Sequence, residues 1–203
     1  NRGLKKNKYY VATWHRRENV HIESSVKSIL ALLSKAPSTV YMPTSYRTQK
    51  VLKEMRLTIP KNVIIVDPVG YNEFLVLMTN SVGVITDSGT VVEETSVLGI
   101  PSLQMRKATE RPQTYDSQSS VKFDPSRPQD YPADVIFKKL SFLSSTTWKH
   151  NLGDGKASER IYLDIVDRLL NNKVANHKRE DYHLNTDRSY REDEIKDWDI
   201  TIV

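Results

Sequence analysis

The sequence predicts an α/β fold, namely a Rossmann-like parallel sheet with helices on both faces. Short apolar runs alternate with longer amphipathic segments along most of the 203 residues. Strands that alternate with helices need crossover connections, which place the strands parallel in one sheet. The runs also lack alternation between apolar and polar residues, as expected of strands that are buried on both faces.

The first half of the chain starts this alternation with β-branched and aromatic residues at 9–14, which favour a strand. Residues 22–35 place Val26, Ile29 and Leu33 at helical spacing and predict an amphipathic helix. The same patterns predict strands at 40–42 and 62–66 and helices at 46–55 and 71–78.

The second half continues with strands at 82–86, 101–105 and 121–123 and helices at 89–98, 132–143 and 157–170. The composition changes at Asn171, after which charged and amide side chains dominate until the apolar residues at 198–203. We therefore expect one Rossmann-like domain over residues 1–170 and a charged tail over residues 171–203. The terminal apolar residues leave open an interaction segment in place of a disordered tail.

The composition excludes several classes of protein. With 38% hydrophobic and 27% charged residues, no cysteine and no long apolar run, we expect a cytoplasmic chain without a membrane segment. The net charge of +5 comes from scattered basic residues, which predicts no nucleic-acid partner and suits a phosphate-bearing small molecule. The first residue is not Met, so we expect a piece of a longer protein.

The turn after the strand at 82–86 is the first candidate site, because ligands of open parallel sheets bind outside the carboxyl ends of the strands. Gly89 and Thr90 begin the next helix, where free amides and the helix dipole attract an anion. Ser88 can cap this helix or donate its hydroxyl to a phosphate, and Asp87 is also a common cap. A capped helix start without a ligand is an equally good interpretation of this turn alone.

Glu93 and Glu94 follow about one helical turn later. Adjacent helical residues point about 100° apart, so at most one carboxylate faces the cleft. That carboxylate could accept hydrogen bonds from a ribose diol beyond the phosphate site. The alternative is a charge that only complements the helix dipole.

Two further turns carry candidate residues. His15, Arg16, Arg17 and Glu18 directly follow the first strand, where Arg can hold phosphate and His can donate a proton. A lone His is more often structural, and no spacing of His and carboxylates here resembles a metal site.

After the third strand, an aromatic residue at the helix start can stack on a base while the loop backbone reads the base edge. Phe74 or Tyr71 could equally belong to the core.

Five segments then resemble a known family in their order and spacing: ATWHRREN, DPVGYNEFLVLM, VITDSGTVVEE, LGIP and MRKATERPQ. They are similar to the second domain of the non-hydrolysing UDP-N-acetylglucosamine 2-epimerases, which have a GT-B fold. GDGKASERI resembles the closing motif of that family, so the resemblance spans residues 9–170. It implies that this chain is the nucleotide-binding, C-terminal half of a GT-B fold.

The resemblance also implies roles for individual residues. In the family, the uracil stacks on the aromatic residue at the position of Phe74, the ribose is held at the position of Glu94, and the diphosphate contacts Ser88, Gly89 and His15. His15 would stabilise or protonate the departing diphosphate. The remaining UDP contacts would be Arg16, Arg17, Val69 and Thr90, and the supporting residues would be Glu18, Asp87, Glu93, Glu110 and Arg111.

The implied reaction is C2 inversion of a UDP-N-acetyl-hexosamine by elimination and re-addition of UDP, in nucleotide-sugar biosynthesis for polysaccharide or glycan. It is redox-neutral and needs no cofactor. The carboxylates that handle the C2 proton belong to the family's first domain, so we expect this chain alone to bind UDP-sugar without turnover. The relatives pair as homodimers, which predicts a homodimer here.

Two departures from the family pattern concern the sugar. Gly89-Thr90 replaces a double glycine and resembles the branch acting on UDP-N-acetyl-L-fucosamine or UDP-N-acetyl-L-rhamnosamine. MPTSYRTQ lacks the histidine of bacterial relatives, which argues against their allosteric substrate site. Two alternatives stay open: the donor-binding half of a GT-B glycosyltransferase, which HRREN and TERP disfavour, and a non-catalytic domain that binds nucleic acid.

Overall fold

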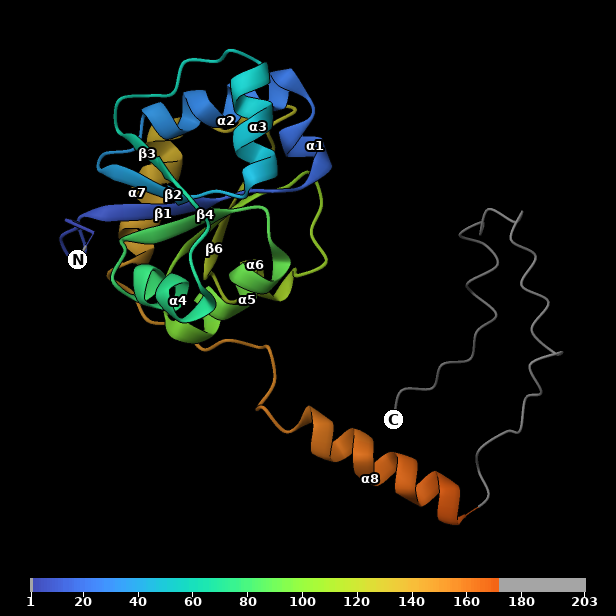
Figure 1. Cartoon of the computed structure of the whole chain (residues 1–203). Coiled ribbons are helices and arrows are strands. Elements are labelled where there is room, and N and C mark those ends of the chain that lie inside the picture. The colour runs from blue at the N-terminus through green and yellow to red at the C-terminus, as the bar shows by residue number, and fades with distance from the viewer. Residues whose placement is uncertain (1, 172–203) are drawn as a thin grey trace, which may run out of the picture. The chain divides into compact units, whose positions relative to one another are not determined.

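The computed structural model describes residues 2–171, in which six strands form one sheet in the order β3-β2-β1-β4-β5-β6 (Figure 1). Every neighbouring pair of strands is parallel. The predicted fold class is therefore confirmed. The strands are β1 (Tyr9–Thr13), β2 (Thr39–Pro43), β3 (Val63–Val66), β4 (Gly83–Thr86), β5 (Ser102–Met105) and β6 (Ser120–Phe123).

Helices cover both faces of this sheet, and the central strand shows why. Successive side chains of a strand point to opposite faces, so Tyr10 and Ala12 enter one core cluster while Tyr9 and Val11 enter the other. Figure 1 shows α2 and α3 on one side of the sheet and α4 and α5 on the other. The helices are α1 (Arg17–Val20), α2 (Glu23–Ser34), α3 (Tyr46–Glu54), α4 (Tyr71–Thr79), α5 (Gly89–Leu98), α6 (Gln113–Asp116), α7 (Ala133–Leu143) and α8 (Ala157–Leu170), with a 3₁₀ turn at Pro128–Asp130.

Each predicted strand and helix within the described range is present, with its ends shifted by no more than one residue. The differences lie in the connections. The short helices α1 and α6 form where the sequence predicts turns, because four residues are too few to show a helical period. The strand β1 ends at Thr13, so Trp14 belongs to the connection that follows it.

Helix α5 has well-defined ends, which fix the start of the candidate site. The hydroxyl of Ser88 accepts a hydrogen bond from the backbone N–H of Val91 at 3.4 Å and caps the first turn. Gly99 ends the helix in the left-handed conformation, with φ of 71°. Helix α5 therefore begins three residues after β4, at Gly89.

The chain divides into two compact units, residues 1–153 and 154–203. The described part of the second unit is α8 with the residues around it, where Arg160 donates to Asp154 at 2.9 Å. The predicted domain boundary between residues 170 and 171 stays a prediction, and the tail predicted over residues 171–203 lies outside the described residues except for Asn171. None of the helices within residues 2–171 is long and apolar enough to cross a membrane.

Candidate functional site

Two connections meet at the carboxyl edge of the sheet, between β1 and β4. The register pairs Thr13 at the end of β1 with Thr86 at the end of β4. The segments that follow, residues 14–19 and 87–90, therefore emerge side by side. Strand β1 lies between β2 and β4, so the direction of strand order reverses there, which is where ligands bind in open α/β sheets.

Asp87 joins these two connections with a buried carboxylate that is 1% exposed. It accepts hydrogen bonds from the backbone N–H groups of His15, at 3.1 Å, and Arg16, at 2.9 Å. The amide of Asn19 donates to the same carboxylate at 3.1 Å and to the carbonyl of Met105 at 2.9 Å. Charge-assisted hydrogen bonds are stronger than neutral ones, so this set fixes the His15 segment against the start of α5.

A cavity of about 300 Å³ lies at this edge. His15, Val69, Phe74 and Ser88, all predicted site residues, contribute to its lining. Phe74 also packs against the smaller core cluster, so it is both a wall of the cavity and part of the core. This volume is at the lower end for small-molecule sites.

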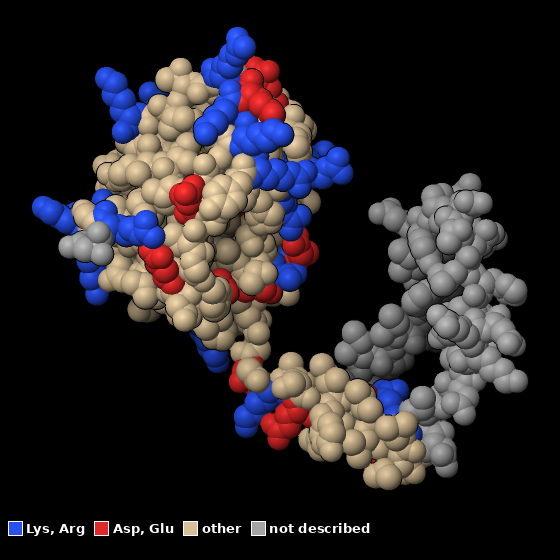
Figure 2. Space-filling view, in the orientation of Figure 1, with Lys and Arg blue, Asp and Glu red and all other residues tan. Residues whose placement is uncertain are grey.

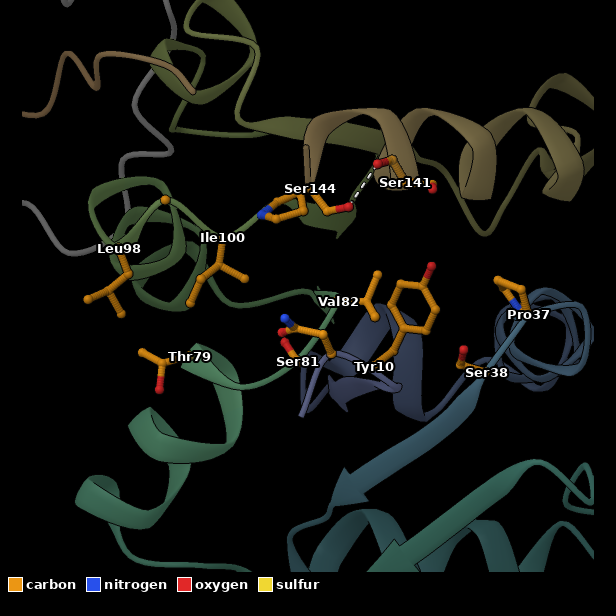
Figure 3. Close-up of a pocket in the computed structure, with 13 residues that line it drawn as sticks. Tyr10, Pro37, Ser38, Thr79, Ser81, Val82, Leu98, Ile100, Ser141 and Ser144 are labelled. Atoms are coloured by element: carbon orange, nitrogen blue, oxygen red, sulfur yellow. Dashed lines mark hydrogen bonds between the residues drawn. The ribbon is translucent and has the colours of Figure 1, made fainter. Parts of the chain in front are cut away.

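A larger cavity of about 500 Å³ lies at the opposite, amino edge of the sheet (Figure 3). Its labelled lining includes Tyr10, Ser38, Ser81 and Ile100, and Ser144 donates to the carbonyl of Ser141 at 2.7 Å. No predicted site residue lines it. We therefore assign the candidate site to the smaller cavity, where the strands' carboxyl ends and the polar residues converge.

The side chains of the adjacent residues Glu93 and Glu94 point in different directions and have different partners, because neighbouring helical residues point about 100° apart. Glu94 accepts a hydrogen bond from the Tyr71 hydroxyl at 2.8 Å, and this bond raises the pKa of Tyr71 above its ordinary value. Glu93 forms an ion pair with Arg111. Glu94 lies one turn beyond Val91, which lines the cavity, so it continues the cavity face of α5. Tyr71 is 63% exposed and is not a core residue.

Glu110 lies against the first residue of α5. Its carboxylate accepts hydrogen bonds from Arg16 at 3.1 Å and from Arg106 at 2.8 Å. A Cβ atom on Gly89 would lie 2.9 Å from Oε1 of Glu110, so the absence of a side chain there permits this close approach. A hydrogen bond to its own backbone, and then the two guanidinium groups, keep the pKa of Glu110 below its ordinary value against an opposing effect of burial.

The remaining predicted residues lie away from the cavity wall. Arg17 and Glu18 are exposed on α1, and Thr90 is exposed on the first turn of α5. None of these three lines the cavity. Within residues 2–171, no group of three or more His, Cys, Asp or Glu is placed to hold a metal ion.

Three residues at this edge were not predicted from the sequence: Asn19, Arg106 and Trp14. Asn19 belongs to the HRREN segment, but nothing in the segment shows that its amide reaches Asp87 and β5. Arg106 directly follows β5, so the rule that ligands bind after strand ends could have found it. A third residue, Trp14, lines the cavity, and its buried indole N–H has no hydrogen-bond partner among the described residues.

Comparisons with known proteins identify the family. A family model described as UDP-N-acetylglucosamine 2-epimerase matches residues 1–166. The UDP-N-acetylglucosamine 2-epimerase of Methanocaldococcus jannaschii is 32% identical over 75% of this chain and 43% of its own length. That of Methanococcus maripaludis is 35% identical over 80% of this chain and 45% of its own length. The chain thus spans less than half the length of these curated relatives.

Solved structures extend the comparison. The Methanocaldococcus jannaschii enzyme in complex with UDP-GlcNAc and UDP matches with a TM-score of 0.67 and 30% identity, over 80% of this chain and 46% of that one. The Neisseria meningitidis enzyme bound to UDP-GlcNAc matches with a TM-score of 0.61 and 27% identity, over 79% of this chain and 45% of that one. The resemblance predicted from the sequence segments is confirmed, and with it the assignment to half of a GT-B fold.

Replacing Asp87 by Asn tests whether the buried carboxylate holds the two connections together. The amide group keeps the volume but can accept hydrogen bonds at only one of its two end atoms, so at least one of the donors that now bond to Oδ1 or Oδ2 would face an NH2 group, and the negative charge is lost. We expect Asp87→Asn to lower the free energy of unfolding by about 1–3 kcal/mol in urea denaturation.

The matched control is Asp116→Asn, at an exposed residue of α6, which should change the same free energy by no more than about 0.5 kcal/mol. Equal effects of the two substitutions would contradict the role assigned to Asp87.

Proposed function

Because the chain belongs to the UDP-N-acetylglucosamine 2-epimerase family, we propose that it is the UDP-binding half of a UDP-N-acetyl-hexosamine 2-epimerase. The observation that carries this proposal is the cavity at the carboxyl edge of the sheet, which the aromatic Phe74 lines together with the polar residues His15 and Ser88. A ligand that fits both ends has an aromatic base and a phosphate. The relatives' structures in complex with UDP or UDP-GlcNAc support this choice of ligand.

The uridine would occupy the cavity side of α4 and α5. Phe74 and Val69 line the cavity and would flank the uracil, with Phe74 stacking on its face. Glu94 would accept the ribose hydroxyls, because it continues the face of α5 that Val91 presents to the cavity. The Tyr71 hydroxyl, which donates to Glu94 at 2.8 Å, would hold that carboxylate beside the cavity.

The diphosphate would bind at the start of α5. Ser88 lines the cavity, and the backbone amides that follow it at Gly89 and Thr90 begin the helix, where the dipole favours negative charge. His15 lines the same cavity, and the side chain of Arg16 is held at this edge by the carbonyl of Asp87 at 2.9 Å. Arg17 and Glu18 lie further out on α1, and their predicted roles stay predictions.

The proposed reaction removes the C2 proton and expels UDP, giving a 2-acetamidoglycal, and then re-adds UDP after C2 is protonated on the other face. The elimination and the re-addition of UDP are together redox-neutral, so the reaction needs no oxidant. His15 would donate its proton to the leaving diphosphate and take it back on re-addition. Its Nδ1 lies 3.5 Å from the carboxylate of Asp87, a contact that would orient the ring with Nε2 toward the ligand. The carboxylates for the C2 proton would come from an N-terminal domain that the described chain lacks.

Several finer features belong to the same proposal. The pair Gly89-Thr90 supports a 6-deoxy-L-sugar nucleotide as the substrate, such as UDP-N-acetyl-L-fucosamine. The homodimer and the cytoplasmic location are carried over from the family. The family match favours an epimerase over a glycosyltransferase, which shares the fold. On the face drawn in Figure 2, basic side chains are interspersed with acidic ones, which favours a small-molecule partner over nucleic acid.

Calorimetric titration of this chain with UDP tests the proposed clamp. We expect binding in the micromolar range, weakened about fivefold or more by Phe74→Ala through loss of stacking. Glu94→Gln should weaken binding by about tenfold, because an amide oxygen alone replaces two accepting oxygens.

Phe142→Ala is the matched control, since this aromatic residue of α7 is 64% exposed and lies outside the site. Unchanged UDP affinity in both site variants would contradict the proposed clamp.

The longer protein that contains both halves allows a test of His15. General acid catalysis typically contributes about 10²–10⁴-fold, so His15→Ala should lower kcat by at least about a hundredfold in an epimerisation assay. His21→Ala is the control, because His21 follows α1 and does not line the cavity. Unchanged turnover of the His15 variant would remove His15 from the mechanism.

A further inference from the structure

A carboxylate of the protein itself lies beside the start of α5, next to Ser88 at the wall of the cavity. Oε1 of Glu110 lies 2.9 Å from the position of a Cβ atom on Gly89, the first residue of α5. Its carboxylate accepts hydrogen bonds from Arg16 and Arg106, at 3.1 and 2.8 Å. A phosphate bound at this helix start could use the same two guanidinium groups as donors.

Neither arginine depends on Glu110 for its position. Arg16 also donates through Nε to the carbonyl of Asp87 at 2.9 Å, and Arg106 donates to the same carbonyl at 3.4 Å. The side chain of Arg106 is only 13% exposed, so its surroundings restrict it as well. Glu110 therefore contributes a negative charge beside the start of α5 more than it holds the two arginines in position.

The side chain of Glu110 is also able to move away from the two arginines. Its side chain is 45% exposed, and ion pairs of exposed groups contribute little to stability. Glutamate has a long side chain that can turn outward without moving the backbone. Its lowered pKa keeps it ionised at neutral pH, so its negative charge is present whenever a ligand arrives.

We propose that Glu110 is an internal counter-ion that occupies the phosphate end of the site and must be displaced by the diphosphate of the ligand. The identity of that ligand rests on the function proposed above. In this role Glu110 lowers the affinity for anions that bind only at the phosphate end, such as pyrophosphate. A nucleotide overcomes this competition because its base and ribose bind elsewhere in the cavity. Glu110 thereby determines specificity, which goes beyond the supporting role predicted from the sequence.

The test compares the unaltered chain with Glu110→Gln by calorimetric titration with UDP, pyrophosphate and uridine. Gln has nearly the same shape but no charge. Removing one negative charge a few ångströms from the diphosphate should tighten UDP and pyrophosphate binding by about tenfold. Uridine, which has no phosphate, should bind both proteins equally.

Glu23→Gln is the matched control, since it removes the same charge from an exposed ion pair with Lys27 on α2 and should change nothing. Unchanged or weaker binding of UDP and pyrophosphate by the Glu110 variant, including no binding at all, would overturn the proposal. If UDP binds no more tightly than pyrophosphate, the proposed function is contradicted. The comparison of pyrophosphate binding by the unaltered chain and by the Glu110 variant still decides the role of Glu110.

Discussion

The buried carboxylate of Asp87 is the interaction on which the rest of the site depends. Parallel register brings the ends of β1 and β4 level at Thr13 and Thr86, so their connections emerge together. Polar connections at a buried sheet edge need partners, since unpaired buried amides cost free energy. Asp87 provides them for His15, Arg16 and Asn19 at once. One side chain therefore holds the backbone of the connection that carries the imidazole and the guanidinium, while the backbone carbonyl of Asp87 accepts from the guanidinium of Arg16.

The site that results has two ends of different chemistry. Phe74 and Val69 form an apolar wall, while His15, Ser88 and the start of α5 form a polar end that favours anions. Such a division is the basis of our proposal that the ligand carries both an aromatic group and a phosphate. Within the described residues the carboxylates near this edge are engaged, Glu93 by Arg111 and Glu110 by two arginines. This arrangement agrees with a clamp that holds the nucleotide while the second half of a longer enzyme acts on the sugar.

The sequence was sufficient for the elements of the fold, because strands buried on both faces and amphipathic helices show their patterns locally. It also pointed to the correct edge of the sheet through the residues after each strand. It could not show that Asp87 bonds to residues about 70 positions earlier, because that pairing depends on strand register. For the same reason the bonds of Asn19 were missed, and the approach of Glu110 to Gly89 is visible only in three dimensions, whereas the place of Arg106 directly after β5 could have indicated it.

The most direct measurement of the central claim is the change of backbone amide chemical shifts when UDP is added to the isotopically labelled chain. The account predicts that the largest changes fall on the connection after β1, on Val69 and Phe74, and on the first two turns of α5. Changes confined to the amino edge of the sheet, at Ser38, Ser81 and Gly99 around the larger cavity, would contradict it. So would a folded chain whose amide shifts do not respond to UDP at all.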